Sequence, residues 1–434
     1  MTPRARTDAQ IPAEAMQLID EAHRRVCVLT NGMTVIAQRH EAAPLVASRV
    51  YVRGGSAFEA EYAGAGISHL LEHVVTGDAA GKRTEREIGE LSEAIGGLIN
   101  AYTCDDHICY HATSRREHLE TAVELLADWT ARPALSDRVF GRELGIVQRE
   151  LERDRDEPDT QLDELIHEVM YPRHPVRYPI IGHRESLMRL TARDLANYHA
   201  RTHVPDNVVV VLVGDLDIER ALPAVCRAFA GFERRAVDMN PLPRPLSITA
   251  PRRMVKNMDV ASASMAIAWQ TVREGHLDDV PLDLLCSVLT HGNNARLVKK
   301  LRWDLGLAFD VGGTHETMWH TAGTFEITAQ LAPGCLEDLE RALLKAIAEL
   351  DKCPITDEEL GRAVRQCTTP LEKQRQTAEG LAAQLGEDFL ASGDVNYTDT
   401  YIARMARATA PDLARVARRY LSAQQSGTAV IFPI

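Results

Sequence analysis

The sequence has no long apolar segment. Its longest aliphatic run, Val208 to Val213, is far shorter than the roughly 20 residues that a helix needs to cross a bilayer. The N-terminal residues MTPRARTDAQIPAEAMQLIDEAHRRV contain no apolar stretch that could serve as the core of a signal peptide. We therefore expect a chain that does not associate with membranes and that is located in the cytoplasm.

The sequence also lacks an excess of positive charge and any closely paired cysteines. Lys and Arg number 49 against 62 Asp and Glu, so the formal net charge is -13. That balance argues against nucleic acid and anionic membranes as partners and mildly favours basic ligands. The eight cysteines are scattered and form no C-x-x-C motif, which in a chain of this length indicates free thiols in a reducing compartment.

The residues that are present describe a globular protein. With 434 residues, 45% of them hydrophobic and 26% charged, the chain is long enough for more than one domain. Residues 45–52 alternate as a strand does, whereas residues 119–129 have the periodicity of an amphipathic helix. Because strands and helices do not alternate strictly, we expect an α+β fold in which sheets of antiparallel type are packed with helices.

The two halves of the chain resemble each other. Residues 190–214 and 408–434 both contain T-A-x-D-L-A, followed by a polar turn and a strand rich in Val and Ile. Thr191 and Thr409 are predicted to cap the helices that begin there, each with an Asp three residues later that suits the positive helix start.

Two further pairs of segments match, but their polar residues differ. HLLEHVVTG (69–77) resembles DLLCSVLTHG (283–292), in which Asp283, Cys286 and Ser287 replace His69, Glu72 and His73. PALSDRVFGRELGIVQRE (133–150) resembles CPITDEELGRAVRQCTTP (353–370), in which Ala363 and Pro370 replace Glu143 and Glu150. The alternative is chance similarity between helices rich in Ala and Leu. The paired loss indicates a duplicated domain in which only the first copy keeps these polar residues.

The joint between the halves is expected within residues 231–256, where prolines interrupt a polar stretch. We therefore divide the chain into four parts. They are an N-terminal extension (1–24), an N-terminal domain that contains His69, Glu72, His73, Glu143 and Glu150 (25–235), a linker (236–256) and a C-terminal homologous domain that lacks these residues (257–434).

The most informative motif is H-x-x-E-H at residues 69–73. On a helix His69 and His73 lie on one face, so both imidazoles can reach a single cation. Glu72 lies on the same turn, close enough to handle a proton of a water molecule at that cation. This order of residues is the inverzincin signature. The alternative is coincidence, because two histidines and a glutamate also meet at these offsets by chance.

A catalytic zinc ion usually has three protein ligands and a water molecule, so a third ligand is needed. The candidate helix is GRELGIVQRELERDRDE (141–157), in which Glu143 and Glu150 are two turns apart and project from one face. From spacing alone, Glu150 could bind the metal and Glu143 could orient the site. The alternative is that these residues, like the other charges of the segment, are solvated.

The chain resembles the pitrilysin/insulinase superfamily of zinc metallopeptidases, and most closely its short branch with the mitochondrial processing peptidases and bacterial relatives. The resemblance runs from TNGMTVI (30–36) through GGSAFEAEYAGAGISHLLEH (54–73) and GGLINAYTCDDHICYHAT (96–113) to Pro179–Gly182. Gly145 to Glu150 fits the family's G-[IV]-[IV]-x-x-E motif. The resemblance implies one Zn²⁺ per chain held by His69, His73 and Glu150, with Glu143 supporting the site.

The resemblance also implies residues that bind substrate. Asn100-Ala101-Tyr102-Thr103 is similar to the family's N-A-x-T, which lines the cleft as an edge strand to which an extended peptide adds. His107 and His111 share the spacing of the two ligands, but they lie on a predicted strand, where such residues are about 13 Å apart. We do not expect them to be ligands.

In the second half, ARLVKKLRWDLGLAF (295–309) is similar to a family segment in which an arginine and a tyrosine reach the substrate carbonyl. Arg302 matches the arginine, whereas Phe309 stands where tyrosine is usual, so the hydroxyl donor is missing. Either Arg302 suffices, another subunit supplies the donor, or turnover is slow. Without the resemblance, the sequence is equally compatible with Arg302 forming a salt bridge on the surface.

The resemblance implies a zinc-dependent endopeptidase that cleaves short or unfolded peptides, with leader or targeting peptides among the candidates. Glu72 would move the proton between water and the leaving amine, and Arg302 would help to stabilise the oxyanion. Short family members pair two chains into a clam-shell chamber, so we expect this chain to form half of one, in a homodimer or in a heterodimer with a related chain. The alternatives are a non-catalytic scaffold subunit and a module that binds peptides without cutting them.

Overall fold

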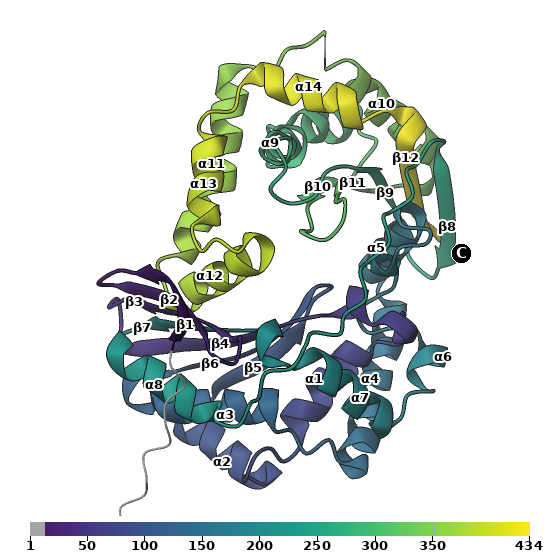
Figure 1. Ribbon diagram of the computed structural model, residues 1–434. Coiled ribbons are helices and arrows are strands. Elements are labelled where there is room, and N and C mark those ends of the chain that lie inside the picture. Colours follow the sequence, from purple (N-terminus) through teal and green to yellow (C-terminus); the bar gives the residue numbers. More distant parts are fainter. Residues whose placement is uncertain (1–13, 351) are drawn as a thin grey trace, which may run out of the picture.

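The protein folds into two halves, each a β-sheet packed with helices (Figure 1). The computed structural model describes residues 14–350 and 352–434. The first half contains a seven-stranded sheet and the second a five-stranded sheet. The predicted class of two α/β-layer domains is therefore confirmed, and each sheet is of mixed type because it contains one parallel pair.

The first sheet has the strand order β1-β2-β3-β7-β4-β6-β5. Its strands are β1 (Glu14–Asp20), β2 (Arg24–Leu29), β3 (Thr34–Arg39), β4 (Leu45–Arg53), β5 (Leu98–Thr103), β6 (His107–Arg115) and β7 (Val208–Gly214). β3 and β7 run parallel, and the other neighbours are antiparallel. β5 lies at one edge and, within residues 14–350 and 352–434, is bonded to β6 only, so its other side is open to a further strand.

Helices cover the outer face of this sheet. They are α1 (Ile67–Gly77), α2 (Glu85–Ala94), α3 (Leu119–Ala131), α4 (Asp137–Asp156), α6 (Arg184–Leu187), α7 (Ala192–Thr202) and α8 (Ile218–Ala228). The core between helices and sheet is aliphatic: Leu70 and Val74 of α1 pack in the same cluster as Val35 and Val50 of the sheet. Burying this face leaves the polar side of α1 outside this core.

The second sheet has the order β10-β11-β9-β12-β8. Its strands are β8 (Arg252–Met258), β9 (Ala263–Gln270), β10 (Asp310–Glu316), β11 (Thr324–Leu331) and β12 (Ser426–Pro433). The helices of this half are α9 (Asp279–Thr290), α10 (Leu336–Ala348), α11 (Asp357–Gln374), α12 (Ala378–Ser392), α13 (Tyr397–Met405) and α14 (Ala410–Tyr420). β10 lies at the edge of its sheet, as β5 does in the first half.

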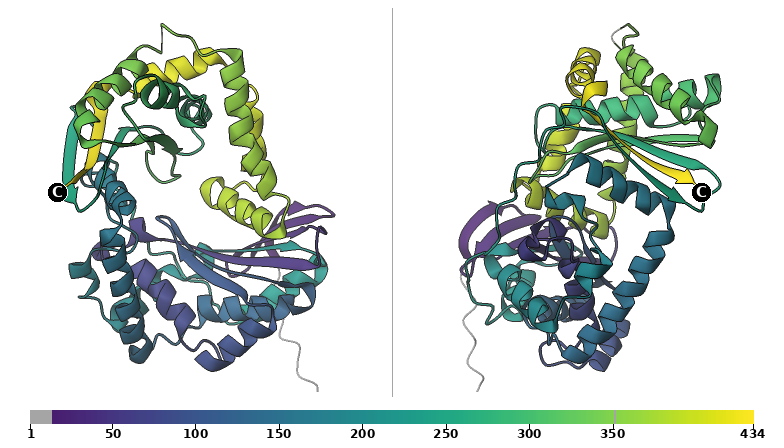
Figure 2. Two further views of the ribbon diagram at one scale, coloured as in Figure 1. Left: turned by 180° about the vertical axis from the view of Figure 1, so that it is seen from behind. Right: turned by 90° about the vertical axis from the view of Figure 1, so that its right-hand side faces the viewer.

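The halves exchange one helix each. α5 (Pro158–Met170) follows α4 in the first half, yet it packs on β9 and β12 of the second sheet. In return, α12 packs on β4 and β7 of the first sheet, as two views show (Figures 1 and 2). The contact is close in both places: Gly386 of α12 lies over the ring of Tyr51, and Gly427 of β12 lies beneath Val169 and Met170. The exchange joins the halves through two hydrophobic clusters.

The structure bears out the predicted internal repeat. α1 and α9 precede the edge strands β5 and β10, and the capped helices α7 and α14 precede the central strands β7 and β12. Thr191 and Thr409 are the predicted N-caps, and each forms a capping box with the Asp three residues later. Similar sequence has therefore produced similar local structure in both halves.

Two of the domain boundaries that we predicted from the sequence fall inside strands, β2 and β8. Of the N-terminal extension proposed for 1–24, residues 1–13 lie outside the described residues, and residues 14–20 form strand β1, paired with β2. The linker proposed for 236–256 has no helix or strand up to β8, which begins at Arg252. The last residues of that segment alternate between exposed and partly buried side chains along β8, which is a strand pattern at the edge of the sheet.

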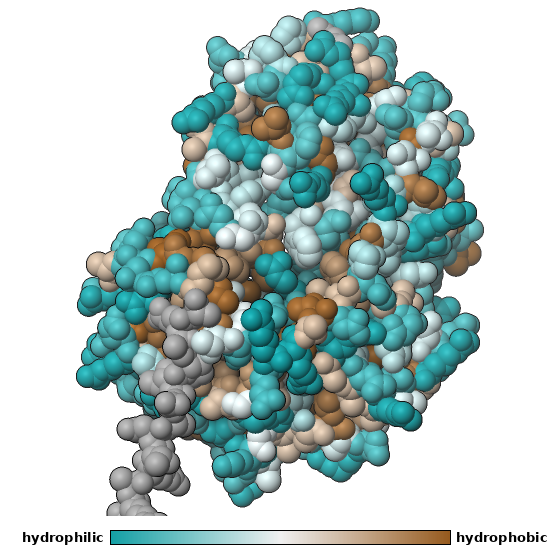
Figure 3. Space-filling view, in the orientation of Figure 1, coloured by the Kyte–Doolittle hydropathy of each residue, from teal (hydrophilic) through white to brown (hydrophobic). Residues whose placement is uncertain are grey.

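Most of the surface seen in Figure 3 is hydrophilic, in agreement with the charge content of the chain. Hydrophobic residues gather toward the left of this face, over the strands β1–β3. β1 there exposes Met16 and Leu18. Among the described residues, no helix is both long enough and apolar enough to cross a membrane.

Candidate metal and peptide site

Helix α1 carries the H-x-x-E-H motif, as predicted. Its apolar side chains face the core, so His69 and His73 emerge together on the opposite side, with ring centroids 4.7 Å apart. The helix begins after Gly66, whose φ is 66°. A Cβ atom at Gly66 would lie 2.2 Å from the carbonyl oxygen of Ile181, so only glycine lets the 179–182 turn sit against the start of α1.

A buried carboxyl group holds the N-terminus of α1. Glu59 is 1% exposed and accepts hydrogen bonds from the backbone N–H groups of Gly66 (3.2 Å) and Ser68 (3.0 Å) and from the Ser68 hydroxyl (2.5 Å). Burial raises the pKa of Glu59 to about 8, although these hydrogen bonds favour the carboxylate. Sequence reasoning missed this residue, because a glutamate eight residues before the helix carries no capping signal.

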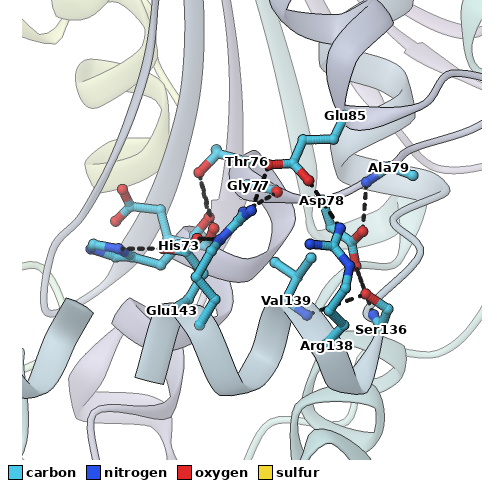
Figure 4. Close-up of polar contacts among 12 residues, drawn as sticks. His73, Thr76, Gly77, Asp78, Ala79, Glu85, Ser136, Arg138, Val139 and Glu143 are labelled. Carbon is cyan, nitrogen blue, oxygen red and sulfur yellow. Dashed lines mark hydrogen bonds and ion pairs between the residues drawn. The ribbon is translucent and has the colours of Figure 1, made fainter. Parts of the chain in front are cut away.

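Helix α4 brings the two predicted carboxylates to His73. Glu143 Oε2 lies 3.5 Å from Nδ1 of His73, and Glu150 Oε2 lies 3.5 Å from Nε2 of the same ring. Figure 4 shows Glu143 reaching from α4 toward His73. The Glu143 carboxylate keeps the proton of the His73 ring on Nδ1, so the lone pair is on Nε2, on the side of Glu150. Carboxylates that do not bind the metal themselves commonly orient histidine ligands in this way.

Several contacts fix α4 against α1. Asp78, directly after α1, accepts hydrogen bonds from the backbone N–H (2.7 Å) and the hydroxyl (2.6 Å) of Ser136, the N-cap of α4 (Figure 4). Arg142 donates to Glu143 Oε1 (2.8 Å) and to the carbonyl oxygen of Gly77 (2.5 Å). These contacts set the register between the two helices. Like Glu59, Asp78 and Arg142 were not singled out from the sequence, because their role depends on the packing of α4 on α1.

His69, His73 and Glu150 suit a metal ion. One ligand atom from each lies within 4.8 Å of the other two. Burial, with a contribution from His73, lowers the pKa of His69 to about 4, so its ring is neutral and can donate a lone pair. Nδ1 of His69 is buried without a hydrogen-bond partner. Two imidazoles and one carboxylate are a donor set that zinc uses in catalytic sites, with a fourth position open.

Glu72 lies beside these residues with a different environment. It is 9% exposed, and its Oε2 accepts a 2.7 Å hydrogen bond from the hydroxyl of Thr103 on β5. Burial raises the pKa of Glu72, while Thr103 and His73 oppose the rise. A carboxyl group with a raised pKa exchanges protons closer to neutral pH, which suits a general base.

The edge strand β5 borders the same pocket. The pocket has a volume of about 510 Å³ and is lined by the metal-site residues together with Ala101, Tyr102 and Thr103. Asn100 is exposed and does not line this pocket; its Oδ1 accepts a hydrogen bond from the Ala101 N–H (2.9 Å). The rest of the lining is rich in charge, with Asp105, Asp154, Asp163, Glu164, Arg153, Arg177 and His167.

Arg302 and Phe309 lie in the other half, away from this pocket. Arg302, on a π-helical turn (Val298–Asp304), lies 3.4 Å from Asp310 and stacks over the ring of Trp303, with 4.8 Å to its centroid. Phe309 precedes β10 and is 56% exposed. Neither residue lines the pocket beside His69 and His73, so the structure of this one chain does not bring them to the site.

His107 and His111, which were not expected to be ligands, lie on β6. Nδ1 of His107 is 2.6 Å from Asp106, and His111 is the register partner of Asn100. Among the described residues, neither belongs to a cluster that could hold a metal.

Comparison with known proteins matches the two halves to two models of one peptidase family. Residues 34–184 match the family described as insulinase (peptidase family M16), and residues 189–367 match the peptidase M16 inactive domain. A Bacillus subtilis protein named uncharacterized zinc protease YmxG is 26% identical over 86% of this chain and 89% of its own length. The probable mitochondrial-processing peptidase subunit beta of Arabidopsis thaliana is 24% identical over 98% of this chain and 81% of its own length.

Solved structures show the same fold. A protease from Helicobacter pylori superposes with a TM-score of 0.87 at 22% identity, covering 94% of this chain and 99% of that chain. A Pseudomonas fluorescens structure titled peptidase M16 inactive domain superposes with a TM-score of 0.84 at 18% identity, covering 95% and 98%.

Proposed function

Because the chain belongs to the pitrilysin/insulinase superfamily of M16 peptidases, we propose that it is a zinc-dependent endopeptidase acting on short or unfolded peptides. The observation that carries the proposal is the meeting of His69, His73 and Glu150 on one wall of a pocket whose other wall is an open strand edge. A metal site alone would serve storage or structure, whereas a metal site beside a place for an extended peptide serves hydrolysis.

His69, His73 and Glu150 would hold one Zn²⁺, with Glu143 fixing the tautomer of His73. Zinc bound there polarises the scissile carbonyl and makes a water molecule acidic enough to react near neutral pH. Glu72 would accept a proton from the attacking water molecule and return it to the leaving amine, and the Thr103 hydroxyl holds the Glu72 carboxylate by a hydrogen bond.

The substrate would bind as an added strand on β5. The strand presents an unpaired edge, so an extended peptide gains backbone hydrogen bonds that do not depend on its side chains. Ala101, Tyr102 and Thr103 border the pocket from this edge, and Asn100 lies at its outer end. Short or unfolded peptides, leader and targeting peptides included, can adopt such an extended strand without first unfolding, which is why they are the proposed substrates.

The two halves of this chain would form one half of a chamber that a second chain completes. Arg302 lies on the half of the chain that carries no H-x-x-E-H motif, away from the pocket in which the zinc ligands lie. In a homodimer or a heterodimer with a related chain, the corresponding arginine of the second chain could face the substrate carbonyl. Phe309 carries no hydroxyl, so Arg302 would act alone unless the second chain brings a donor.

A second candidate is a non-catalytic scaffold or peptide-binding subunit of a heterodimer. The observation that favours it is Phe309, because the side chain that faces solvent there cannot donate a hydrogen bond. The two functions share β5 and differ in their need for Glu72.

The test uses the purified full-length chain, measured for zinc content and for cleavage of a mixed peptide library. The Glu72→Gln variant removes the base, and Glu152→Gln, an exposed residue of α4, is the matched control. Cleavage by wild type and by Glu152→Gln but not by Glu72→Gln, with zinc in all three, supports the peptidase. Zinc and peptide binding without cleavage by any variant supports the second candidate, and a chain that binds no zinc contradicts the peptidase.

A further inference from the structure

A second cluster of metal-binding side chains lies in the second half. Asp279 and Asp283 are one turn apart on α9, and His315 lies on the edge strand β10. One ligand atom from each lies within 4.8 Å of the other two. This position corresponds to the first site, because α9 and β10 are the counterparts of α1 and β5 in the repeat. Asp283 is at the sequence position that matches His69 of the first half.

His315 is built into this cluster. Its side chain is fully buried (0% exposed), with Nδ1 2.8 Å from Asp283 Oδ1 and Nε2 3.1 Å from the hydroxyl of Thr271. If Nε2–H donates to Thr271, the Nδ1 lone pair faces a carboxylate oxygen, an arrangement that a cation between them stabilises. A histidine whose second nitrogen is hydrogen-bonded is the usual form of a metal ligand.

Asp279 supplies an independent sign of a missing ligand. It is 1% exposed, and its Oδ2 accepts hydrogen bonds from the Gly275 N–H (3.1 Å) and the Tyr397 hydroxyl (3.3 Å). Its Oδ1 is buried and has no hydrogen-bond partner in the part of the chain that the structure describes. A buried carboxylate oxygen without a donor is costly, so such an atom ordinarily has a cation, a water molecule or a proton beside it.

The surrounding charges do not neutralise the two aspartates. Among the described residues, no Lys or Arg forms an ion pair with Asp279 or Asp283. The guanidinium of Arg404 influences both electrostatically, but it donates a hydrogen bond to the carbonyl oxygen of His276. Glu274, which also faces Asp279, adds a further acidic group. Burial and the neighbouring Asp283 raise the pKa of Asp279 to about 6, which reflects the same uncompensated charge.

We propose that Asp279, Asp283 and His315 bind a divalent transition-metal ion, of the zinc or manganese class, that clamps α9 to β10. Two carboxylates and one imidazole suit ions of this class, and Asp283, whose side chain is 20% exposed, gives the ion a route in. The second half therefore lacks the H-x-x-E-H site but carries a different one. The clamp holds the edge strand β10 against its helix, as the Thr103–Glu72 contact does for β5. The proposal does not depend on peptidase activity.

The alternative occupant is a proton. His315 as an imidazolium paired with Asp283, beside a protonated Asp279, would also satisfy the cluster. The two occupants are separated by metal stoichiometry, measured on full-length protein that has been stripped with a chelator and dialysed against Zn²⁺ or, separately, Mn²⁺.

We expect about two zinc equivalents in wild type, about one in Asp283→Asn and about one in His73→Ala, because each change removes a ligand from one of two independent sites. Asp394→Asn, an exposed residue outside both clusters, is the control and should keep both equivalents. Added Mn²⁺ should raise the melting temperature of His73→Ala but not that of His73→Ala/Asp283→Asn.

Equal metal content in wild type and folded Asp283→Asn overturns the proposal and assigns the cluster to a proton. If Asp283→Asn does not fold, His73→Ala decides instead: one retained equivalent supports the second site, and none overturns it. Peptide cleavage is measured in parallel, so a chain that fails as a peptidase can still confirm or contradict this site.

Discussion

The hydroxyl of Thr103 donates a 2.7 Å hydrogen bond to the carboxylate of Glu72. Through this contact the strand that would hold the peptide, β5, is tied to α1, the helix that carries the proposed zinc ligands His69 and His73. The carboxylate that must face the water molecule is therefore positioned by the element that positions the substrate. This coupling suggests how substitutions on β5 affect catalysis without touching the metal.

Replacing Thr103 with Val removes the hydrogen bond and keeps the shape of the side chain. We expect kcat to fall about tenfold, equivalent to roughly 1.4 kcal/mol, since one hydrogen bond to a charged group contributes about that much. Because Thr103 lowers the pKa of Glu72, its loss raises that pKa, so the acid limb of the pH–rate profile should move to higher pH. Steady-state kinetics from pH 5 to 9 measure both effects.

The Thr103→Ser variant is the control, because it keeps the hydroxyl and should retain both the rate and the profile. Zinc content should be unchanged in both variants. A Thr103→Val enzyme with lost zinc would show that the hydroxyl supports the metal and not the base.

Glu150 and Glu143 should differ in their effect on zinc. Glu150→Gln removes a proposed ligand, so zinc binding should be lost at micromolar concentrations. Glu143→Gln removes only the charge beside Nδ1 of His73, and loss of such an outer partner typically weakens metal affinity about 10–100-fold. Competition with a chromogenic chelator measures both affinities, and Glu152→Gln should bind zinc as wild type does. Equal losses for Glu143→Gln and Glu150→Gln would contradict the assigned roles.

Glu59 should make the stability of the protein depend on pH. The pKa of its buried carboxyl is about 8 in the folded chain and close to the ordinary 4.5 in the unfolded chain. Between these values the unfolded chain releases a proton that the folded chain keeps, so the free energy of unfolding falls as pH rises from about 5 to 8. The stability that Glu59 contributes is fully present below pH 4.5.

The comparison for Glu59 is Glu59→Gln, which cannot ionise and should lose less stability over the same pH range. Urea unfolding at pH 5 and pH 8 gives the two free energies. Glu59→Ala, which leaves the backbone N–H groups of Gly66 and Ser68 without an acceptor, should cost about 1–3 kcal/mol at pH 5. Parallel pH curves for wild type and Glu59→Gln would mean that the Glu59 carboxyl ionises at its ordinary pKa.

Gly386 should be essential to the exchange of helices between the halves. A Cβ atom there would lie 2.2 Å from Cε2 of Tyr51, so Gly386→Ala must push α12 off the first sheet or move the buried ring. Overpacking of this kind costs about 1–3 kcal/mol. Gly89→Ala is the matched control, because nothing lies within 4 Å of its would-be Cβ and alanine favours the helix.

The midpoint of thermal or urea unfolding tests this prediction, with Gly386→Ala below wild type and Gly89→Ala equal to it or slightly above. An unchanged midpoint for Gly386→Ala would show that α12 or the Tyr51 ring can move to accept the Cβ atom without loss of stability. The two halves would then be joined mainly by α5 on the second sheet.

Local periodicity made much of this architecture predictable. The alternation of residues 45–52 and the T-A-x-D-L-A starts identified a strand and two capped helices, because hydrophobic side chains at period 2 or 3.6 form one continuous face. Resemblance between the halves identified the repeat. The exchange of α5 and α12 was not predictable, because the pattern of apolar residues in a helix shows which face is buried but not which sheet that face packs on.

Helix geometry by itself placed His69 and His73 on one face of α1, and Glu143 and Glu150 on one face of α4. The choice of Glu150 as the third ligand came from the resemblance to the family, which is also read from the sequence. Only the tertiary structure decided that α4 lies where Glu143 and Glu150 meet opposite nitrogens of His73, and that Thr103 and Glu59 hold α1 from its two sides. It also separated Arg302 from the site and assembled Asp279, Asp283 and His315. These relations join residues far apart in the chain, and distances of that kind are set by how helices and sheets pack.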